Sequence, residues 1–208
     1  YVWEKDDTVY HEDEAAEILC RICRGDHMEA SGPQEGKIEL KAACDGLFRV
    51  DVERLNAINE IDQVMIATRR SHTPVKKGEK LIGTRVIPLV IKKEKMEQAK
   101  RLAGPAPLCE LLPYRLKKAG VITTGNEVYS GRIADAFTPV VEKKLAQYGM
   151  RMEAHVTLGD GKQEIAEAIR RMKAEGCELI LATGGMSVHP DDQTPGAIRE
   201  SGAEIVSY

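Results

Sequence analysis

The second half of the sequence alternates between short apolar runs and segments in which apolar residues repeat at helical spacing. Residues 119–124 form an apolar run, and residues 133–148 carry large apolar side chains at three- and four-residue intervals. The alternation continues through runs at 152–158 and 177–183, which are separated by a helical repeat at 165–172. Strands that alternate with helices over short connections predict a parallel sheet covered by helices. The last of these runs is almost entirely apolar, which predicts a strand buried on both faces.

Signals for helix ends support this pattern. Asp160 with Gln163 three residues later is a capping-box pattern, so a helix is expected to begin there. Thr194 followed by Pro195 predicts another helix, because threonine suits the N-cap and proline suits the first helical position. Residues 204–208 then predict a fourth strand.

The first half of the sequence has mainly the pattern of β-strands. Apolar and charged residues alternate over residues 38–42, and residues 64–68 and 81–91 also read as strands. The pair Asp45-Gly46 predicts a tight hairpin turn after the first of these strands. A helix is expected before them, because apolar side chains over residues 15–23 fall on one helical face.

The run Gly104-Pro105-Ala106-Pro107 is the best linker candidate in the chain. We therefore expect two domains of an α/β protein. The first is a smaller, β-rich α+β domain with an early helix over residues 1–110. The second, over residues 116–208, has a mainly parallel sheet with helices on both faces.

Composition excludes several classes of protein. The chain has 30 Lys and Arg residues against 33 Asp and Glu residues, without the positive excess of a nucleic-acid-binding protein. No apolar stretch approaches the roughly 18 residues of a membrane span. The five cysteines do not form the dense pattern of a small secreted protein, so we expect a cytoplasmic protein. Cys20 and Cys23 have the spacing of a zinc or redox motif, but Cys23 continues an apolar helical stripe, which favours core packing.

Two glycine-containing loops follow predicted strands in the second half. The first is Thr123-Thr124-Gly125-Asn126-Glu127, which leads to Asp135. The second is Thr183-Gly184-Gly185-Met186-Ser187, which leads to Asp192 and Thr194. In a parallel sheet, both loops leave carboxyl ends of strands, where ligands bind. Glycines, hydroxyls and free N–H groups at a helix start favour an oxyanion such as phosphate, and the nearby carboxylates are suited to Mg²⁺.

Each loop also has a purely structural interpretation. Glycine-rich turns are common after strands, and neighbouring Asp or Asn residues often cap helices, so one loop alone favours neither interpretation. Neither loop has the Gly-x-Gly-x-x-Gly or Gly-Lys-Ser/Thr signature of nucleotide-binding loops. Two such loops at equivalent strand ends favour a site, with a polyphosphate or a pterin phosphate as the ligand class.

The two loops resemble the two motifs of the molybdopterin-binding (MoCF) domain family. Residues 123–135 resemble the first motif and residues 183–195 the second, and the resemblance covers about residues 116–208. The family includes molybdopterin adenylyltransferases, molybdenum-inserting molybdotransferases and competence-damage-type nucleotide hydrolases. The whole chain resembles bacterial stand-alone molybdopterin-binding proteins. The resemblance implies a mainly parallel α/β fold and a homo-oligomer, and we expect the domain to be truncated at Tyr208 relative to the family pattern.

The resemblance also implies roles for residues of both loops. It implies a catalytic or Mg²⁺-binding role for Asp135 and Asp192. It implies contacts with the pterin or nucleotide for Thr124, Gly125, Asn126, Glu127, Gly184, Gly185, Met186, Ser187 and Thr194. Asn126 stands where the molybdotransferase motif has an aspartate, so one negative charge of that motif is missing.

Two kinds of function follow from the resemblance. One is an enzyme of molybdenum cofactor biosynthesis that adenylates molybdopterin or inserts molybdate, with molybdopterin and Mg²⁺-ATP as its cofactors. The other is a non-catalytic carrier or sensor of molybdopterin, which the presence of Asn126 favours. A competence-damage-type nucleotide pyrophosphatase is a further alternative. The expected partners are a pterin, a nucleotide and other copies of the chain, with no nucleic acid and no membrane.

Overall fold

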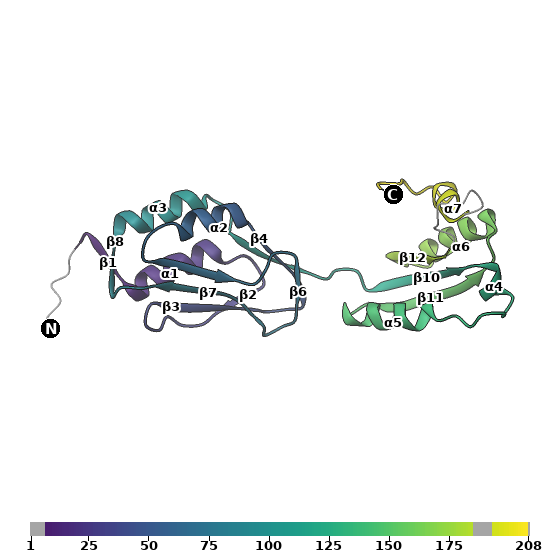
Figure 1. The fold of residues 1–208 in the computed structure, drawn as a ribbon, viewed down its shortest axis with the longest axis horizontal. Helices are drawn as coiled ribbons and strands as arrows, with labels where there is room; N and C mark the ends of the chain where they lie inside the picture. Colours follow the sequence, from purple (N-terminus) through teal and green to yellow (C-terminus); the bar gives the residue numbers. More distant parts are fainter. Residues whose placement is uncertain (1–6, 185–192, 208) are drawn as a thin grey trace. The chain divides into compact units, whose positions relative to one another are not determined.

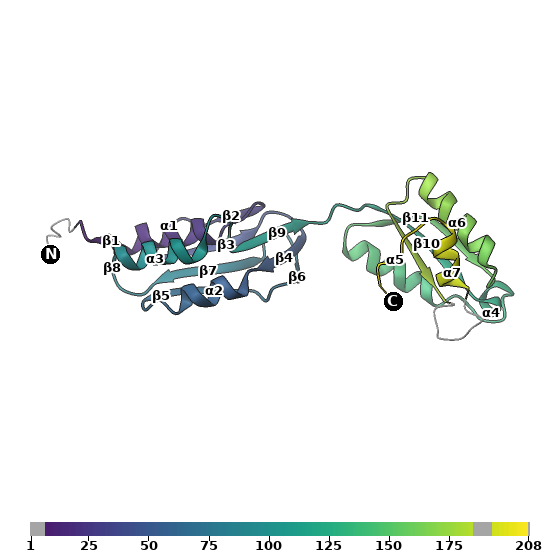
Figure 2. The same cartoon turned by 90° about the horizontal axis from the view of Figure 1, so that it is seen from above.

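The computed structural model describes residues 7–184 and 193–207, and the chain divides into two compact units (Figures 1 and 2). Unit 1 is Tyr1–Tyr114 and unit 2 is Arg115–Tyr208. Both units combine helices with sheets, which confirms the mixed α/β class predicted from the sequence. Among the described residues, no helix is both long enough and apolar enough to cross a bilayer.

Unit 1 packs its helices against antiparallel sheets around one hydrophobic core. Its helices are α1 (Glu12–Cys23), α2 (Val52–Asn59) and α3 (Lys93–Ala103). Its strands are β1 (Val9–His11), β2 (Met28–Ala30), β3 (Lys37–Ala42), β4 (Gly46–Val50), β5 (Val64–Thr68), β6 (Thr73–Val75), β7 (Lys80–Val86), β8 (Val90–Lys92) and β9 (Cys109–Pro113). One sheet has the order β2-β3-β7-β5, a second has the order β6-β4-β9, and β1 pairs with β8.

The hairpin predicted at Asp45-Gly46 is wrong, because β3 and β4 belong to different sheets. Strand β4 pairs instead with β9 along its whole length. The backbones approach so closely that a Cβ at Gly46 would lie 2.4 Å from the carbonyl oxygen of Leu112. Asp45 holds the loop by accepting hydrogen bonds from Lys76 Nζ and the Lys77 amide, each at 2.8 Å. Long-range strand pairing therefore overrides the local turn signal.

The proline-rich run at 104–107 lies within unit 1 and is held by Arg54. The Arg54 guanidinium donates to the carbonyl oxygens of Ala103, Ala106 and Pro107, the last two at 2.9 and 3.4 Å. The chain then returns to the unit 1 core through β9. The run thus connects α3 to β9 inside one compact unit.

The cysteines of α1 are core residues, which confirms the core packing predicted from the sequence. Cys20 and Cys23 are buried, and both face the hydrophobic core of unit 1. Burial raises the pKa of both thiols, and it raises the pKa of the buried Cys109 to about 12. These thiols are therefore protonated at neutral pH and behave as small apolar side chains.

Unit 2 contains a three-stranded sheet whose described strands are all parallel. The strands are β10 (Lys118–Thr124), β11 (Arg151–Leu158) and β12 (Leu179–Thr183), in the order β11-β10-β12. The helices are α4 (Asn126–Tyr129), α5 (Phe137–Gln147), α6 (Lys162–Ala174) and α7 (Thr194–Glu200). Helices α5 and α6 pack on opposite faces of the sheet (Figure 1). Successive β10 side chains alternate between them, since Val121 packs toward α5 and Ile122 toward α6.

Strand β12 packs on both faces of the sheet, as predicted for this apolar run, but it is only partly buried: Ile180 and Ala182 pack on the α6 face, and Leu179 and Leu181 pack on the α5 face. All of its residues are partly exposed, because β12 forms an edge of the sheet. A cavity of about 380 Å³ lies beside it and is lined by Ile180, Ala182 and Ile198, among others. The fourth strand predicted at 204–208 is wrong, because the described residues 204–207 have no regular structure and Val206 is 92% exposed. An apolar run favours an extended strand, but only a partner strand can satisfy its backbone.

Three helix starts in unit 2 differ from the predictions. Helix α6 has Gly161 and not Asp160 as its N-cap, and it has no side-chain cap; the Asp160 amide donates to Asn126 Oδ1 at 3.4 Å. Helix α7 includes Thr194 as its first residue, so it begins one residue earlier than an N-cap at this threonine predicts. Helix α5 begins at Phe137, four residues after the start of the apolar repeat, and Phe137 is 62% exposed.

Candidate functional site

The three strands of unit 2 end side by side in a row of threonines. Thr123 of β10 pairs in register with Thr157 of β11 and with Thr183 of β12. Because β10 connects to β11 on one side and lies beside β12 on the other, the strand order reverses between β10 and β12. Such a reversal at the carboxyl ends of parallel strands is the usual place for a ligand in an open α/β sheet.

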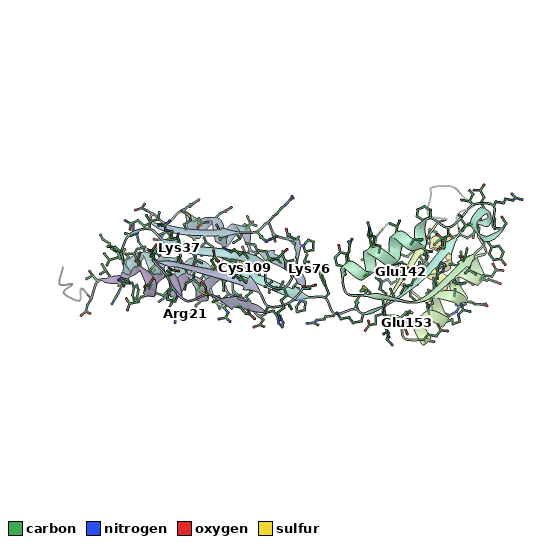
Figure 3. The ribbon with its side chains drawn as sticks, turned by 90° about the horizontal axis from the view of Figure 1, so that it is seen from below. Arg21, Lys37, Lys76, Cys109, Glu142 and Glu153 are labelled. Atoms are coloured by element: carbon green, nitrogen blue, oxygen red, sulfur yellow. The ribbon has the colours of Figure 1, made fainter. Side chains whose placement is uncertain are left out.

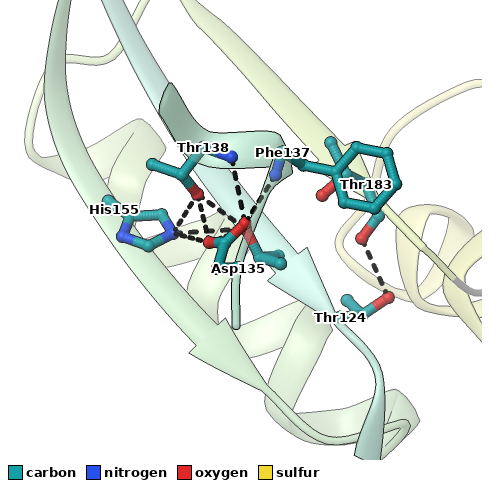
Figure 4. Close-up of polar contacts among 7 residues, drawn as sticks. Thr124, Asp135, Phe137, Thr138, His155 and Thr183 are labelled. Carbon is teal, nitrogen blue, oxygen red and sulfur yellow. Dashed lines mark hydrogen bonds and ion pairs between the residues drawn. The ribbon is translucent and has the colours of Figure 1, made fainter. Parts of the chain in front are cut away.

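The two glycine-containing loops meet at this reversal. Gly184 has a φ of +92°, and a Cβ added there would lie 2.3 Å from the carbonyl oxygen of Thr124. Two hydrogen bonds fix the contact. The Thr124 hydroxyl donates to Thr183 O at 3.1 Å (Figure 4), and the Thr194 hydroxyl donates to Gly184 O at 3.2 Å. The second loop therefore leaves β12 directly against the first, and only glycine fits at position 184.

Among the described residues, the hydroxyl of Thr183 has no hydrogen-bond partner although its oxygen is buried. A buried polar atom without a partner costs free energy, so native structures rarely contain one unless a ligand, ion or water completes it. The unpaired hydroxyl lies in the threonine row, between the two loops. It is thus free to interact with a ligand group at the end of β12.

The first loop is attached to the sheet at both ends. At its start, Gly125 has a φ of +134° and its amide donates to Leu158 O of β11 at 3.1 Å. Its middle forms α4, and Glu127 O accepts the amides of Arg132 and Ile133 at 2.9 and 3.2 Å. The side chains of Asn126 and Glu127 are exposed at the rim of the sheet.

The loop ends at Asp135, whose carboxylate joins β10 to the start of α5 (Figure 4). Oδ1 accepts the amides of Phe137 and Thr138 at 2.9 and 3.0 Å. Oδ2 accepts the hydroxyls of Thr138 and, at 3.3 Å, of Thr123. These hydrogen bonds, led by the one from the Thr138 hydroxyl, lower the pKa of Asp135. An ionised carboxylate has about four acceptor positions, and here all of them are used.

His155 of β11 completes this cluster and was not singled out from the sequence. Its Nε2 atom lies 2.9 Å from the Thr138 hydroxyl, 3.2 Å from the Thr123 hydroxyl and 3.7 Å from Asp135 Oδ2. In the sequence, His155 lies 20 residues from Asp135 and appears in no motif. Because side chains alternate along a strand, the sequence could have predicted that His155 and Val156 face opposite sides of the sheet. Only the register of β11 on β10 brings His155 to Thr123.

Residues 120–207 match the family model of the probable molybdopterin binding domain. This match confirms the resemblance predicted from the two loops. It covers unit 2 alone.

Curated relatives match less than half of this chain. A CinA-like protein from Mycobacterium sp. strain JLS is 36% identical over 91 residues, covering 43% of this chain and 21% of the relative. One from Mycobacterium tuberculosis strain CDC 1551 is 35% identical over the same length and the same shares. The chain thus spans about a fifth of the length of these relatives.

Two solved structures are similar to about two fifths of this chain. CinA from Thermoplasma acidophilum, a protein of unknown function, is 28% identical to this chain. The match covers 41% of this chain and 50% of the CinA chain, with a TM-score of 0.39. The molybdopterin biosynthesis enzyme MoaB from Thermus thermophilus is also 28% identical, covering 41% of this chain and 54% of its own, with a TM-score of 0.39.

The structure describes part of the residues predicted for the site of this molybdopterin-binding-type domain. It brings together the loop residues Thr124, Gly125, Gly184 and Thr194 at the ends of β10 and β12. Asn126 and Glu127 lie in α4, and Asp135 lies at the start of α5 on the α5 face of the sheet. The remaining predicted residues, Gly185, Met186, Ser187 and Asp192, lie outside the described residues.

The described part of the domain forms no complete cation site, and Asp192, the second predicted Mg²⁺ ligand, lies outside it. No group of three or more His, Cys, Asp or Glu side chains within residues 7–184 and 193–207 is placed to hold a metal ion. At Asp135, Mg²⁺ would have to displace a hydrogen bond from an amide of α5 or from a threonine hydroxyl. The carboxylate is therefore better suited to fixing the loop than to binding metal in this conformation.

Proposed function

We propose that unit 2 binds molybdopterin at the carboxyl ends of β10 and β12 and acts in molybdenum cofactor biosynthesis. The observation that carries the proposal is the junction of the two loops, where Gly184 lies on the Thr124 carbonyl beside the unpaired Thr183 hydroxyl. The glycine lets the two loops pack directly against each other, and the unpaired hydroxyl beside them offers a hydrogen bond to a phosphate or to a polar group of the pterin. The match to the probable molybdopterin binding domain supports this ligand class.

Two versions of the function differ in chemistry. In the enzymatic version, unit 2 adenylates molybdopterin with Mg²⁺-ATP or inserts molybdate, and Asp135 and Asp192 act in the catalytic site. In the second version, unit 2 is a non-catalytic carrier or sensor of molybdopterin. The hydrogen bonds of Asp135 favour the second version, because they use all four acceptor positions of its carboxylate and leave none free for a metal.

The proposal extends to the assembly and the compartment. Exposed apolar side chains on α4 and α5, with Tyr129, Phe137 and Val140 each more than half exposed, support a homo-oligomer. The five free cysteines suit the reducing cytoplasm. Sedimentation of the full chain at several concentrations tests the first point, and a single concentration-independent monomer would contradict it.

Calorimetry with molybdopterin under anaerobic conditions tests the binding proposal. Thr183→Val removes the unpaired hydroxyl while keeping the shape of the side chain, so affinity should fall roughly three- to tenfold without loss of stability. Thr84→Val is the matched control, because it removes a buried threonine hydroxyl from unit 1. Its affinity should equal that of the wild type. If the wild type does not bind molybdopterin, the proposal fails.

Activity assays separate the versions. Transfer of AMP from ATP to molybdopterin would establish the enzymatic version and exclude the carrier. Hydrolysis of ADP-ribose, with no affinity for molybdopterin, would instead establish the nucleotide pyrophosphatase alternative, to which the similarity to CinA-like proteins points. Binding of molybdopterin without either activity is the result expected for a carrier.

A further inference from the structure

We propose that His155 is a positioning residue of the unit 2 site, which acts through Thr138 to hold Asp135 and thereby the first glycine-containing loop. The inference rests on the proposed function of this site and names a residue that neither loop motif contains. The observation behind it is the chain of contacts from β11 through α5 to the end of β10 (Figure 4).

The hydrogen bonds assign a direction to this chain. A threonine hydroxyl has one proton, and that of Thr138 is directed to Asp135 Oδ2, the shortest contact in the cluster. The oxygen of Thr138 is then the acceptor for His155 Nε2, which lies 2.9 Å away. Nε2 must therefore carry a proton. The chain runs from the His155 N–H to the Thr138 hydroxyl and from that hydroxyl to the Asp135 carboxylate.

A β-bulge in β11 allows His155 to reach this position. Ala119 of β10 pairs with Met152, whereas Gly120 pairs with Ala154, so Glu153 is an extra residue without a partner on β10. Met152 and His155 are three residues apart, so in a regular strand they would face opposite sides of the sheet. Because of the bulge, both side chains face α5. Figure 3 labels Glu153 on β11 and Glu142 on α5.

The position of Asp135 decides the position of the first loop. The loop leaves β10 at Gly125, whose amide is bonded to Leu158 O of β11 at 3.1 Å, and it returns at Asp135. Asp135 also fixes the start of α5, because α5 has no side-chain cap at its assigned N-cap residue, Ala136. Strand β11 thus holds the loop at both ends, through Leu158 O and through His155. His155 itself is 30% exposed in its side chain, and its contribution is to the geometry of the loop.

A double-mutant cycle on molybdopterin affinity tests the inference. His155→Leu removes the Nε2 proton and should weaken binding by the equivalent of one hydrogen bond, roughly three- to tenfold. Thr138→Val should weaken binding at least as much, since it also removes the donor to Asp135. If His155 acts through Thr138, the double variant should bind like Thr138→Val alone. Losses that multiply, or an unchanged affinity in His155→Leu, would overturn the inference.

Two further variants separate positioning from general damage. His155→Gln retains an N–H donor at similar reach and should recover most of the affinity. His72→Leu, which removes an exposed histidine with one hydrogen bond to Ser71 Oγ in unit 1, should leave binding unchanged. A His155→Gln variant that binds as weakly as His155→Leu would contradict a role of the Nε2 proton.

Nuclear magnetic resonance of the wild-type imidazole tests the geometry even if the leucine variant does not fold. The neutral ring should be the Nε2–H tautomer, and this signal should change in Thr138→Val. An Nδ1–H tautomer would overturn the inference. Because this readout needs no ligand, it decides on His155 even if the wild type binds no molybdopterin, in which case only the proposed function fails.

Discussion

Replacing Gly184 by alanine should disrupt the junction between the two loops of unit 2. An added Cβ would lie 2.3 Å from Thr124 O and 2.8 Å from Thr124 Oγ1, so the backbone must move. The residue also has a φ of +92°, a conformation that L-residues avoid. The movement would strain the hydrogen bonds from Thr124 to Thr183 O and from Thr194 to Gly184 O, which are 3.1 and 3.2 Å long.

The size of the effect follows from these contacts. The left-handed backbone costs an alanine about 1–2 kcal/mol. Each disrupted hydrogen bond adds about 0.5–1.5 kcal/mol, so Gly184→Ala should destabilise the site by about 2–5 kcal/mol. Gly176→Ala is the matched control, because Gly176 has a φ of +89° with no atom within 4 Å of an added Cβ. It should cost about 1–2 kcal/mol.

Hydrogen exchange at the amides of β10 and β12 measures this difference within unit 2, independently of unfolding in unit 1. Exchange should accelerate more in Gly184→Ala than in Gly176→Ala. The affinity for molybdopterin should fall only in Gly184→Ala. If the two variants accelerate exchange equally, the contact with Thr124 contributes nothing, and the reasoning about the loop junction is refuted.

Two more predictions concern titratable groups. Hydrogen bonds lower the pKa of Asp135, and the one from the Thr138 hydroxyl contributes most. The folded protein therefore gains stability above the unfolded pKa of about 4, and it loses this stability as the pH falls through the lower, folded pKa. Unfolding free energies measured from pH 6 to pH 2 should therefore fall less steeply in Asp135→Asn, and equal slopes would contradict the assignment. In the native protein, a thiol reagent should label the partly exposed Cys44 first. It should label Cys109 only on unfolding, because burial shields this thiol and raises its pKa to about 12. Mass spectrometry after partial labelling measures the order, and labelling of Cys109 before Cys44 would contradict the prediction.

The local pattern of the second half predicted its elements well, because helices and strands have different periods that a single segment displays. The run at 119–124 corresponds to β10 (Lys118–Thr124), and the run at 152–158 corresponds to β11 (Arg151–Leu158). The glycine-containing loops after β10 and β12 were sufficient to predict the molybdopterin-binding family. The roles of the individual loop residues stay predictions.

Which strands pair with each other could not be predicted from the sequence, because strand pairing depends on residues far apart in the chain. Asp45-Gly46 has the composition of a hairpin, yet β4 pairs with β9, some sixty residues later in the sequence. The apolar run of β12 resembles a central strand, yet β12 lies at an edge of the sheet. Full burial of a strand needs a neighbouring strand on each side, and no local pattern specifies which neighbour is there.

The sequence by itself determined that unit 2 alternates strands and helices and that glycines and hydroxyls follow its strands, since these are properties of short segments. Only the tertiary structure decided that Gly184 lies on Thr124, that the Thr183 hydroxyl has no partner within residues 7–184 and 193–207, and that His155 joins Asp135. The physical reason is that hydrogen bonds act over about 3 Å, so strand register and the bulge in β11 determine which side chains meet.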